Sequence, residues 1–181
     1  GEGENAMKQL VSIFAVLLLA GCMGQPSLED EKLSDLDLNL EEFFEGKTVA
    51  YGHFQDVFGT VRRLFKVDIE GEWDGKTLTM VEDFVYEDNS TEQRIWTLEK
   101  TGDQTWVGQA DGVYGTASGE ERGNAFNWNY QFDLPTEGGS MKVTFNDWMW
   151  QLTEDRLLNK AYISRFGLRL GEVVIMFEKI S

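Results

Sequence analysis

The chain has 181 residues, with 32 aspartates and glutamates against 16 lysines and arginines, which gives a formal net charge of −16 at pH 7. Such an acidic protein repels nucleic acid and anionic lipid head groups, because binding to either depends on lysine and arginine side chains that neutralise phosphate. One histidine, His53, and one cysteine, Cys22, are too few for a zinc site, and a single cysteine forms no disulfide within the chain.

The first predicted element is an export signal over residues 7–21. It begins with Met7 and the positive Lys8, and continues with residues 10–19, which are apolar except for Ser12. This apolar run has about half of the ~20 residues that a membrane-spanning helix needs, so a cleaved signal is expected instead. Residues 1–6, GEGENA, put two glutamates ahead of the positive region and are interpreted as an expression remnant.

The sequence Leu19-Ala20-Gly21-Cys22 resembles the lipobox of bacterial lipoproteins. The resemblance implies that the signal is cut before Cys22 and that this cysteine is lipidated, with two or three acyl chains that make the membrane attachment stable. Met23 stands where the enterobacterial lipoproteins retained in the inner membrane have aspartate, so the resemblance implies an outer membrane protein facing the periplasm. The alternative is a free cysteine buried behind a hydrophobic helix.

Residues 22–38 are expected to form the lipidated cysteine and a flexible acidic tether, since they are polar and include one of only two prolines. A short helix follows, with Asn39 as its cap and Gly46 at its end. Its apolar side chains have helical spacing: Leu40, Phe43 and Phe44.

From residue 47 the pattern changes to strands. In residues 126–134, aromatic or aliphatic side chains alternate with polar ones, which is typical of a strand with one dry face and one wet face. Turn pairs such as Asp74-Gly75 and Asp111-Gly112 separate such runs, because tight hairpin turns require positive φ. The pattern predicts ten strands, at residues 47–57, 60–73, 76–87, 92–101, 104–110, 113–119, 125–134, 140–151, 156–166 and 172–180.

Consecutive hairpins form an antiparallel up-and-down meander, and closing the meander into a barrel removes its two exposed edges. The strand count and hairpin order resemble the calycins, the group of lipocalins and fatty-acid-binding proteins. We therefore expect an all-β domain over residues 39–181, a calycin-like barrel of about 8–10 strands with one short N-terminal helix. A partly open barrel is the alternative. The stretches FFEGKTVAYGHFQDVFG and NDWMWQLTEDRLLNKAYISRFGLRLGEV are also similar to a family of Gram-negative lipoproteins of unknown function.

Three charged residues, Arg63, Glu82 and Arg94, lie on strand faces that are otherwise apolar. Charges are seldom buried without partners, which leaves two interpretations for the arginines. Each could lie near a strand end with its head group in water, or each could pair with Glu82 or bind a ligand carboxylate inside the barrel. Fatty-acid-binding proteins use interior arginines in the second way, so the resemblance implies a lipid or fatty-acyl ligand.

The candidate ligand-binding residues combine these charges with aromatic neighbours: Arg63, Glu82, Arg94, Trp96, Trp128 and Tyr130. No catalytic residue, metal or cofactor is predicted. The neighbouring carboxylates Glu82 and Asp83 point to opposite faces of one strand, although a catalytic pair drawn from different strands stays open.

The leading hypothesis is therefore a non-enzymatic lipoprotein whose barrel binds a hydrophobic small molecule. The alternatives are a ligandless barrel that engages another envelope protein, and an enzyme that acts on lipids. A continuous apolar cavity would favour the first, a filled interior with an exposed Trp/Met patch the second, and convergent carboxylates the third.

Overall fold

The computed structural model describes residues 24–32 and 34–181, so the signal segment and Cys22 lie outside the described residues. The chain divides into two compact units at residue 30, and residues 31–181 contain every described helix and strand. None of the described helices has the length and hydrophobicity required to traverse a membrane. The predicted division of the N-terminal part into a signal and a tether ahead of the barrel domain therefore stays a prediction.

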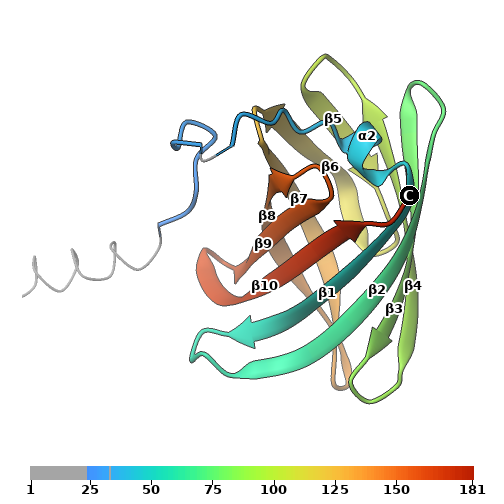
Figure 1. Cartoon of the computed structure of the whole chain (residues 1–181). Helices are drawn as coiled ribbons and strands as arrows, with labels where there is room; N and C mark the ends of the chain where they lie inside the picture. The colour runs from blue at the N-terminus through green and yellow to red at the C-terminus, as the bar shows by residue number, and fades with distance from the viewer. Residues whose placement is uncertain (1–23, 33) are drawn as a thin grey trace, which may run out of the picture. The chain divides into compact units, whose positions relative to one another are not determined.

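Ten antiparallel strands follow one short helix and close into a barrel, which confirms the predicted all-β meander (Figure 1). The elements are α2 Leu40–Phe44, β1 Gly46–Asp56, β2 Val61–Trp73, β3 Thr77–Tyr86, β4 Thr91–Lys100, β5 Thr105–Gln109, β6 Val113–Arg122, β7 Ala125–Thr136, β8 Gly139–Thr153, β9 Arg156–Arg165 and β10 Leu168–Lys179.

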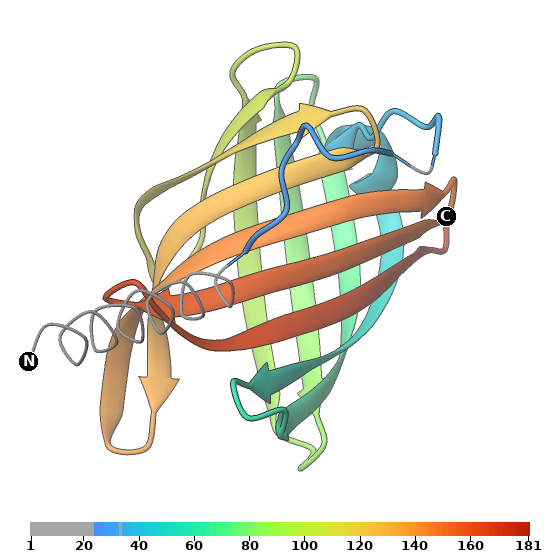
Figure 2. The same ribbon diagram turned by 90° about the vertical axis from the view of Figure 1, so that its left-hand side faces the viewer.

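The barrel closes because β1 pairs with β2 on one side and with β10 on the other. Ala50, in the middle of β1, lies opposite Val67 of β2 and Phe177 of β10. The first and last strands therefore leave no free edge, and the strands wrap around the interior as Figure 2 shows. The partly open alternative is wrong.

Several observed strands are longer than predicted, and two of them differ from the prediction by three residues or more at one end. The last strand begins at Leu168 and not at residue 172, because Phe166 and Gly167 alone make the turn with φ of 51° and 77° and Leu168 already pairs with Arg165. The sixth strand runs on to Arg122, since the turn before β7 is formed by Gly123 and Asn124.

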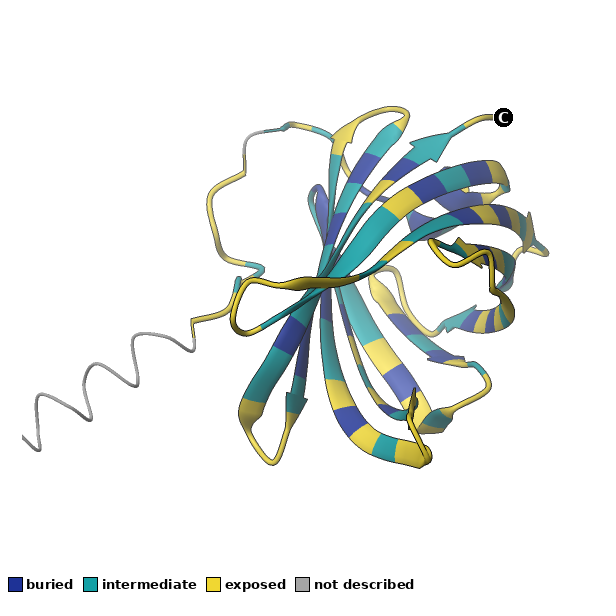
Figure 3. Ribbon diagram, turned by 90° about the horizontal axis from the view of Figure 1, so that it is seen from below, coloured by how far each residue is buried: buried dark blue, intermediate teal, exposed yellow. Residues whose placement is uncertain are grey.

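Buried and exposed side chains alternate along the strands, as the period-two pattern predicted (Figure 3). In β3 the side chains of Leu78, Met80 and Phe84 are buried, while that of Val85 is exposed. The inward residues form the core and the wall of the barrel interior.

The helix α2 closes one end of the barrel, where Leu40, Phe43 and Phe44 are all buried. The start of the helix differs from the prediction, because the Asn39 side chain makes no capping hydrogen bond. Instead the backbone N–H of Leu40 donates to a carboxylate oxygen of the buried Glu121 at 2.8 Å. At the far end of the helix, Gly46 has φ of 90°, in the left-handed region where glycine is favoured.

Candidate functional site

A cavity of about 720 Å³ lies inside the barrel. It runs from Leu40 and Phe44 of α2, at the closed end, to Arg63, Ser90 and Pro135 near the hairpin tips at the other end. Eight of the ten strands supply lining residues, all except β5 and β6. The interior is therefore hollow, and side chains from distant parts of the sequence face one another across it.

Most of the cavity wall is apolar and aromatic, with edge-to-face contacts between rings of different strands. The ring of Trp96 on β4 lies 5.8 Å from that of Trp128 and 5.2 Å from that of Tyr130, both on β7. Tyr130 also stacks on Phe145 of β8 at 4.9 Å. Such contacts fix the ring orientations and leave a rigid apolar wall.

All six residues singled out in the sequence line this cavity: Arg63, Glu82, Arg94, Trp96, Trp128 and Tyr130. Alternation along β2, β3, β4 and β7 turns each of them inward. Their contact with a ligand stays a prediction, since no ligand is present.

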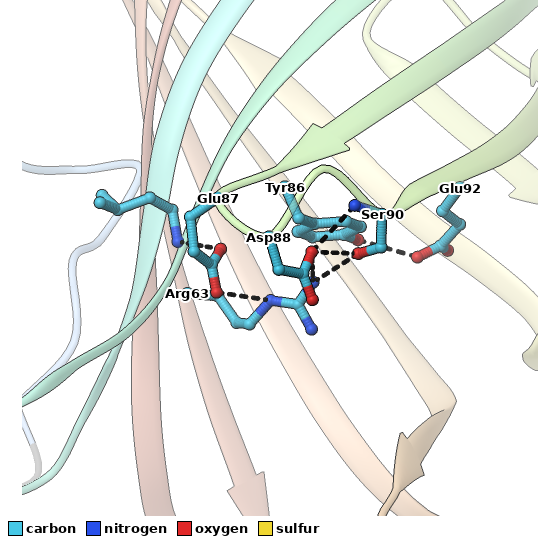
Figure 4. Close-up of polar contacts among 7 residues, drawn as sticks. Arg63, Tyr86, Glu87, Asp88, Ser90 and Glu92 are labelled. Carbon is cyan, nitrogen blue, oxygen red and sulfur yellow. Dashed lines mark hydrogen bonds and ion pairs between the residues drawn. The ribbon is translucent and has the colours of Figure 1, made fainter.

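Arg63 lies at the mouth of the cavity within a polar network (Figure 4). Its guanidinium group is 3.4 Å from Glu87 and 3.9 Å from Asp88, and it lies over the ring of Tyr86 at 4.0 Å. The side chain is 43% exposed. Arg63 therefore fits the interpretation in which an arginine at a strand end keeps its head group partly in water.

Arg94 lies deeper, with a side chain that is 22% exposed. It donates to a carboxylate oxygen of Glu92 at 2.7 Å, while the hydroxyl of Tyr86 donates to the other oxygen of Glu92 at 2.8 Å. Burial alone would lower the pKa of Arg94, but Glu82, Tyr130 and Glu92 outweigh burial and raise it above its ordinary value. The guanidinium group therefore stays charged inside the barrel.

Two carboxyl groups face the same interior, Glu82 from β3 and Asp147 from β8. Burial raises the pKa of Glu82 to about 7, against a lowering by Arg94, and Asp147 adds to the rise. Burial likewise raises the pKa of Asp147 to about 7, although an amide hydrogen bond from Asn159 opposes it. Perturbed carboxyls in a cavity are typical of functional sites, so these two groups mark its polar centre.

Tyr130 completes this centre. Burial raises the pKa of Tyr130 well above its ordinary value, and Asp147 raises it further, so the phenol stays protonated. Its hydroxyl has no hydrogen-bond partner among residues 24–32 and 34–181, and it lines the cavity. We call Glu82, Arg94, Tyr130 and Asp147 the polar centre from here on.

The model of one protein family matches residues 16–179 of the chain. The chain belongs to the DUF3833 family, proteins of unknown function. Both the expected family of unknown function and the calycin-like barrel are therefore confirmed. No curated protein matches the chain in sequence.

Two solved structures resemble the barrel. The S-type phycobiliprotein lyase CPES from Guillardia theta has a TM-score of 0.59 at 11% sequence identity, over 80% of this chain and 94% of that one. A redesigned β-barrel, mFAP1, bound to DFHBI, has a TM-score of 0.41 at 9% identity, over 76% of this chain and 96% of that one. At these identities the lyase shares the fold alone.

Sequence reasoning missed Asp147, Asn159 and Glu92, which all line the cavity. A signal for Asp147 was present, because it alternates with Phe145 and Met149 on the inward face of β8. Among residues 24–32 and 34–181, no group of three histidine, cysteine or acidic side chains is arranged to hold a metal ion.

Replacing Glu82 should remove a defined part of the pH dependence of stability. Its pKa is raised to about 7 from an ordinary value of 4.5, so folding favours the neutral carboxyl and the free energy of unfolding falls as the pH rises between these values. Glu82→Gln should therefore raise the free energy of unfolding by roughly 3 kcal/mol above about pH 8, with no gain below about pH 4. Denaturant unfolding at a series of pH values measures this difference.

Asp83→Asn is the matched control, because Asp83 is the next residue of β3 and lies exposed on the outer face. It should show little pH-dependent gain. An equal effect of Glu82→Gln at both pH extremes would mean that Glu82 is not a desolvated acid.

Proposed function

We propose that this protein is a lipoprotein of the outer membrane, facing the periplasm, whose barrel binds a hydrophobic small molecule of lipid or fatty-acyl kind. The observation that carries the proposal is the apolar cavity of about 720 Å³ inside the closed barrel. Small-molecule sites in proteins are typically concave, mostly apolar and roughly 300–1,000 Å³ in size.

The chemistry of the wall supports an apolar ligand. Each methylene group that leaves water for such a wall gains about 0.8 kcal/mol, so a long alkyl chain is the kind of molecule that gains most from this cavity. A ligandless barrel would need a filled interior and an exposed Trp/Met patch. No tryptophan is among the exposed large hydrophobic residues of the described chain, and Met176 is their one methionine.

A second candidate function is acid–base chemistry on a bound lipid. The observation that favours it is the convergence of Glu82 and Asp147, each with a pKa of about 7, on one interior space. The expectation that this protein is not an enzyme stays a prediction, because a structure of similar fold is that of a phycobiliprotein lyase. A bound lipid recovered chemically changed by the protein, and unchanged by a Glu82→Gln/Asp147→Asn variant, would favour this second function.

Filling part of the cavity should weaken binding. Ala161 lines the cavity from β9 and lies opposite Asp147 in the strand register. Ala161→Phe places a ring in the cavity and should weaken the binding of the neutral dye Nile red at least about tenfold, equivalent to ~1.4 kcal/mol. Fluorescence titration of the full chain measures the affinity, and cooperative thermal unfolding verifies that the variant folds.

Thr97→Phe is the control for an added ring, since Thr97 is exposed on β4. Binding that survives Ala161→Phe, or that falls equally in Thr97→Phe, would place the dye outside the barrel and contradict the proposal.

The membrane anchor rests on the lipobox. Cys22→Ala removes the sulfur that would carry the lipid, so the protein should move from the membrane pellet to the soluble fraction of lysed cells. Fractionation with immunodetection measures the shift. A variant that stays in the pellet after a carbonate wash would argue against lipidation at Cys22.

A further inference from the structure

The basic side chains that line the cavity already have carboxylate partners. The guanidinium group of Arg62 is 2.7 Å from Asp56, and that of Arg94 is 2.7 Å from Glu92. Arg63 pairs with Glu87 at 3.4 Å. A ligand anion would therefore compete with a carboxylate for every arginine that it could reach in the cavity.

The two carboxyls of the polar centre have no cation in direct contact, although the charge of Arg94 lowers the pKa of Glu82 from farther away. Glu82 lies opposite Arg94 in the register of β3 and β4, yet the ion pair of Arg94 is with Glu92. No lysine or arginine among residues 24–32 and 34–181 forms an ion pair with Glu82 or Asp147. The polar neighbour of Asp147 is the uncharged amide of Asn159, which donates to one of its two oxygens.

The centre of the cavity therefore has more acidic than basic groups, because Glu82 and Asp147 face one arginine, Arg94, whose ion pair is with Glu92. Asp147 is only 8% exposed, and its second carboxyl oxygen has no protein partner in the described chain. Burying a carboxylate is costly, and Arg94 at Glu82 and Asn159 at Asp147 offset that cost only in part, so both carboxyls hold their protons up to a pH of about 7. A cation brought in by a ligand would remove this cost, whereas a second anion would add to it.

We propose that the polar centre selects an alkyl ligand whose head group donates hydrogen bonds, with a protonated amine preferred to a hydroxyl and a hydroxyl preferred to a carboxylate. The ammonium group would lie between Glu82 and Asp147, and the alkyl chain would lie along the aromatic wall. This inference rests on the proposed binding function, and it differs from the arginine–carboxylate hypothesis in the charge of the head group.

The preference should depend on pH, because an amine binds best once both carboxyls are ionised. The other charged or titratable groups around the pair are Arg94 and Glu92 of β4, Tyr130 of β7 and, nearer the mouth, Tyr86 and Arg63. Arg94 and Tyr130 have raised pKa values and keep their protons near neutrality. Affinity for an amine should rise between about pH 6 and pH 8, while affinity for an alcohol should stay nearly constant.

Three probes that share an unbranched alkyl chain and differ in the head group test the proposal: decylammonium, decan-1-ol and decanoate. Each is titrated below its aggregation concentration into the full chain, with the fluorescence of the cavity tryptophans or heat release as the readout. At about pH 8, decylammonium should bind at least about tenfold more tightly than decanoate, with decanol between them. Glu82→Gln/Asp147→Asn should erase this order, and Asp83→Asn, on the outer face of β3, should leave it unchanged.

Equal affinities for the three probes, or tightest binding of decanoate, would overturn the inference while leaving the binding function in place. Failure of all three probes to bind would instead overturn the proposed function, and the inference with it. If the double variant does not fold, the order of the probes and its change between about pH 6 and pH 8 in the unaltered chain decide the question alone.

Discussion

The pairing of β1 with β10 is the constraint on which the rest of the structure depends. The register Ala50↔Phe177 joins strands that are far apart in sequence and turns a ten-strand meander into a closed wall. Once the wall is closed, every second residue of each strand must face the interior. That interior holds a core at one end and a cavity of about 720 Å³ beside it.

The helix α2 accounts for the difference between the packed end of the barrel and the hollow end. Its side chains Leu40, Phe43 and Phe44 fill the closed end, and polar contacts hold the helix there: Glu121 accepts the N–H of Leu40, Lys100 pairs with Glu41, and Lys179 donates to the carbonyl of Phe43. Gly71 of β2 makes the close approach possible, because a Cβ there would lie 1.8 Å from the carbonyl oxygen of Phe44. The opposite end has no such plug among the described elements, so the cavity reaches the hairpin tips.

Most of the fold could be predicted because each strand carries its own signal. Strict alternation in residues such as Phe126, Trp128 and Tyr130 indicates a face, and turn glycines indicate where a strand ends. Alternation says nothing about depth along the barrel, however. Arg63 and Arg94 therefore looked equivalent in sequence, although one lies at the mouth and the other is held inside by Glu92.

The partners of the polar centre could not be predicted for the same reason. Asp147 on β8 raises the pKa of Glu82 on β3 across the barrel, a relation that depends on closure and register and not on local pattern. The start of β10 was also predicted too late, because the segment 167–171, with a glycine at each end, was interpreted as a turn, whereas Phe166 and Gly167 are enough for the turn.

Native mass spectrometry of the protein purified from its own cell envelope tests the central claim most directly. A ligand held in the cavity should add a discrete mass to the polypeptide and its covalent lipid, and should leave as a free alkyl-chain molecule on organic extraction. The same mass should be missing from the Ala161→Phe variant. A protein that carries no releasable small molecule, with the cavity accessible and the fold intact, would contradict the account.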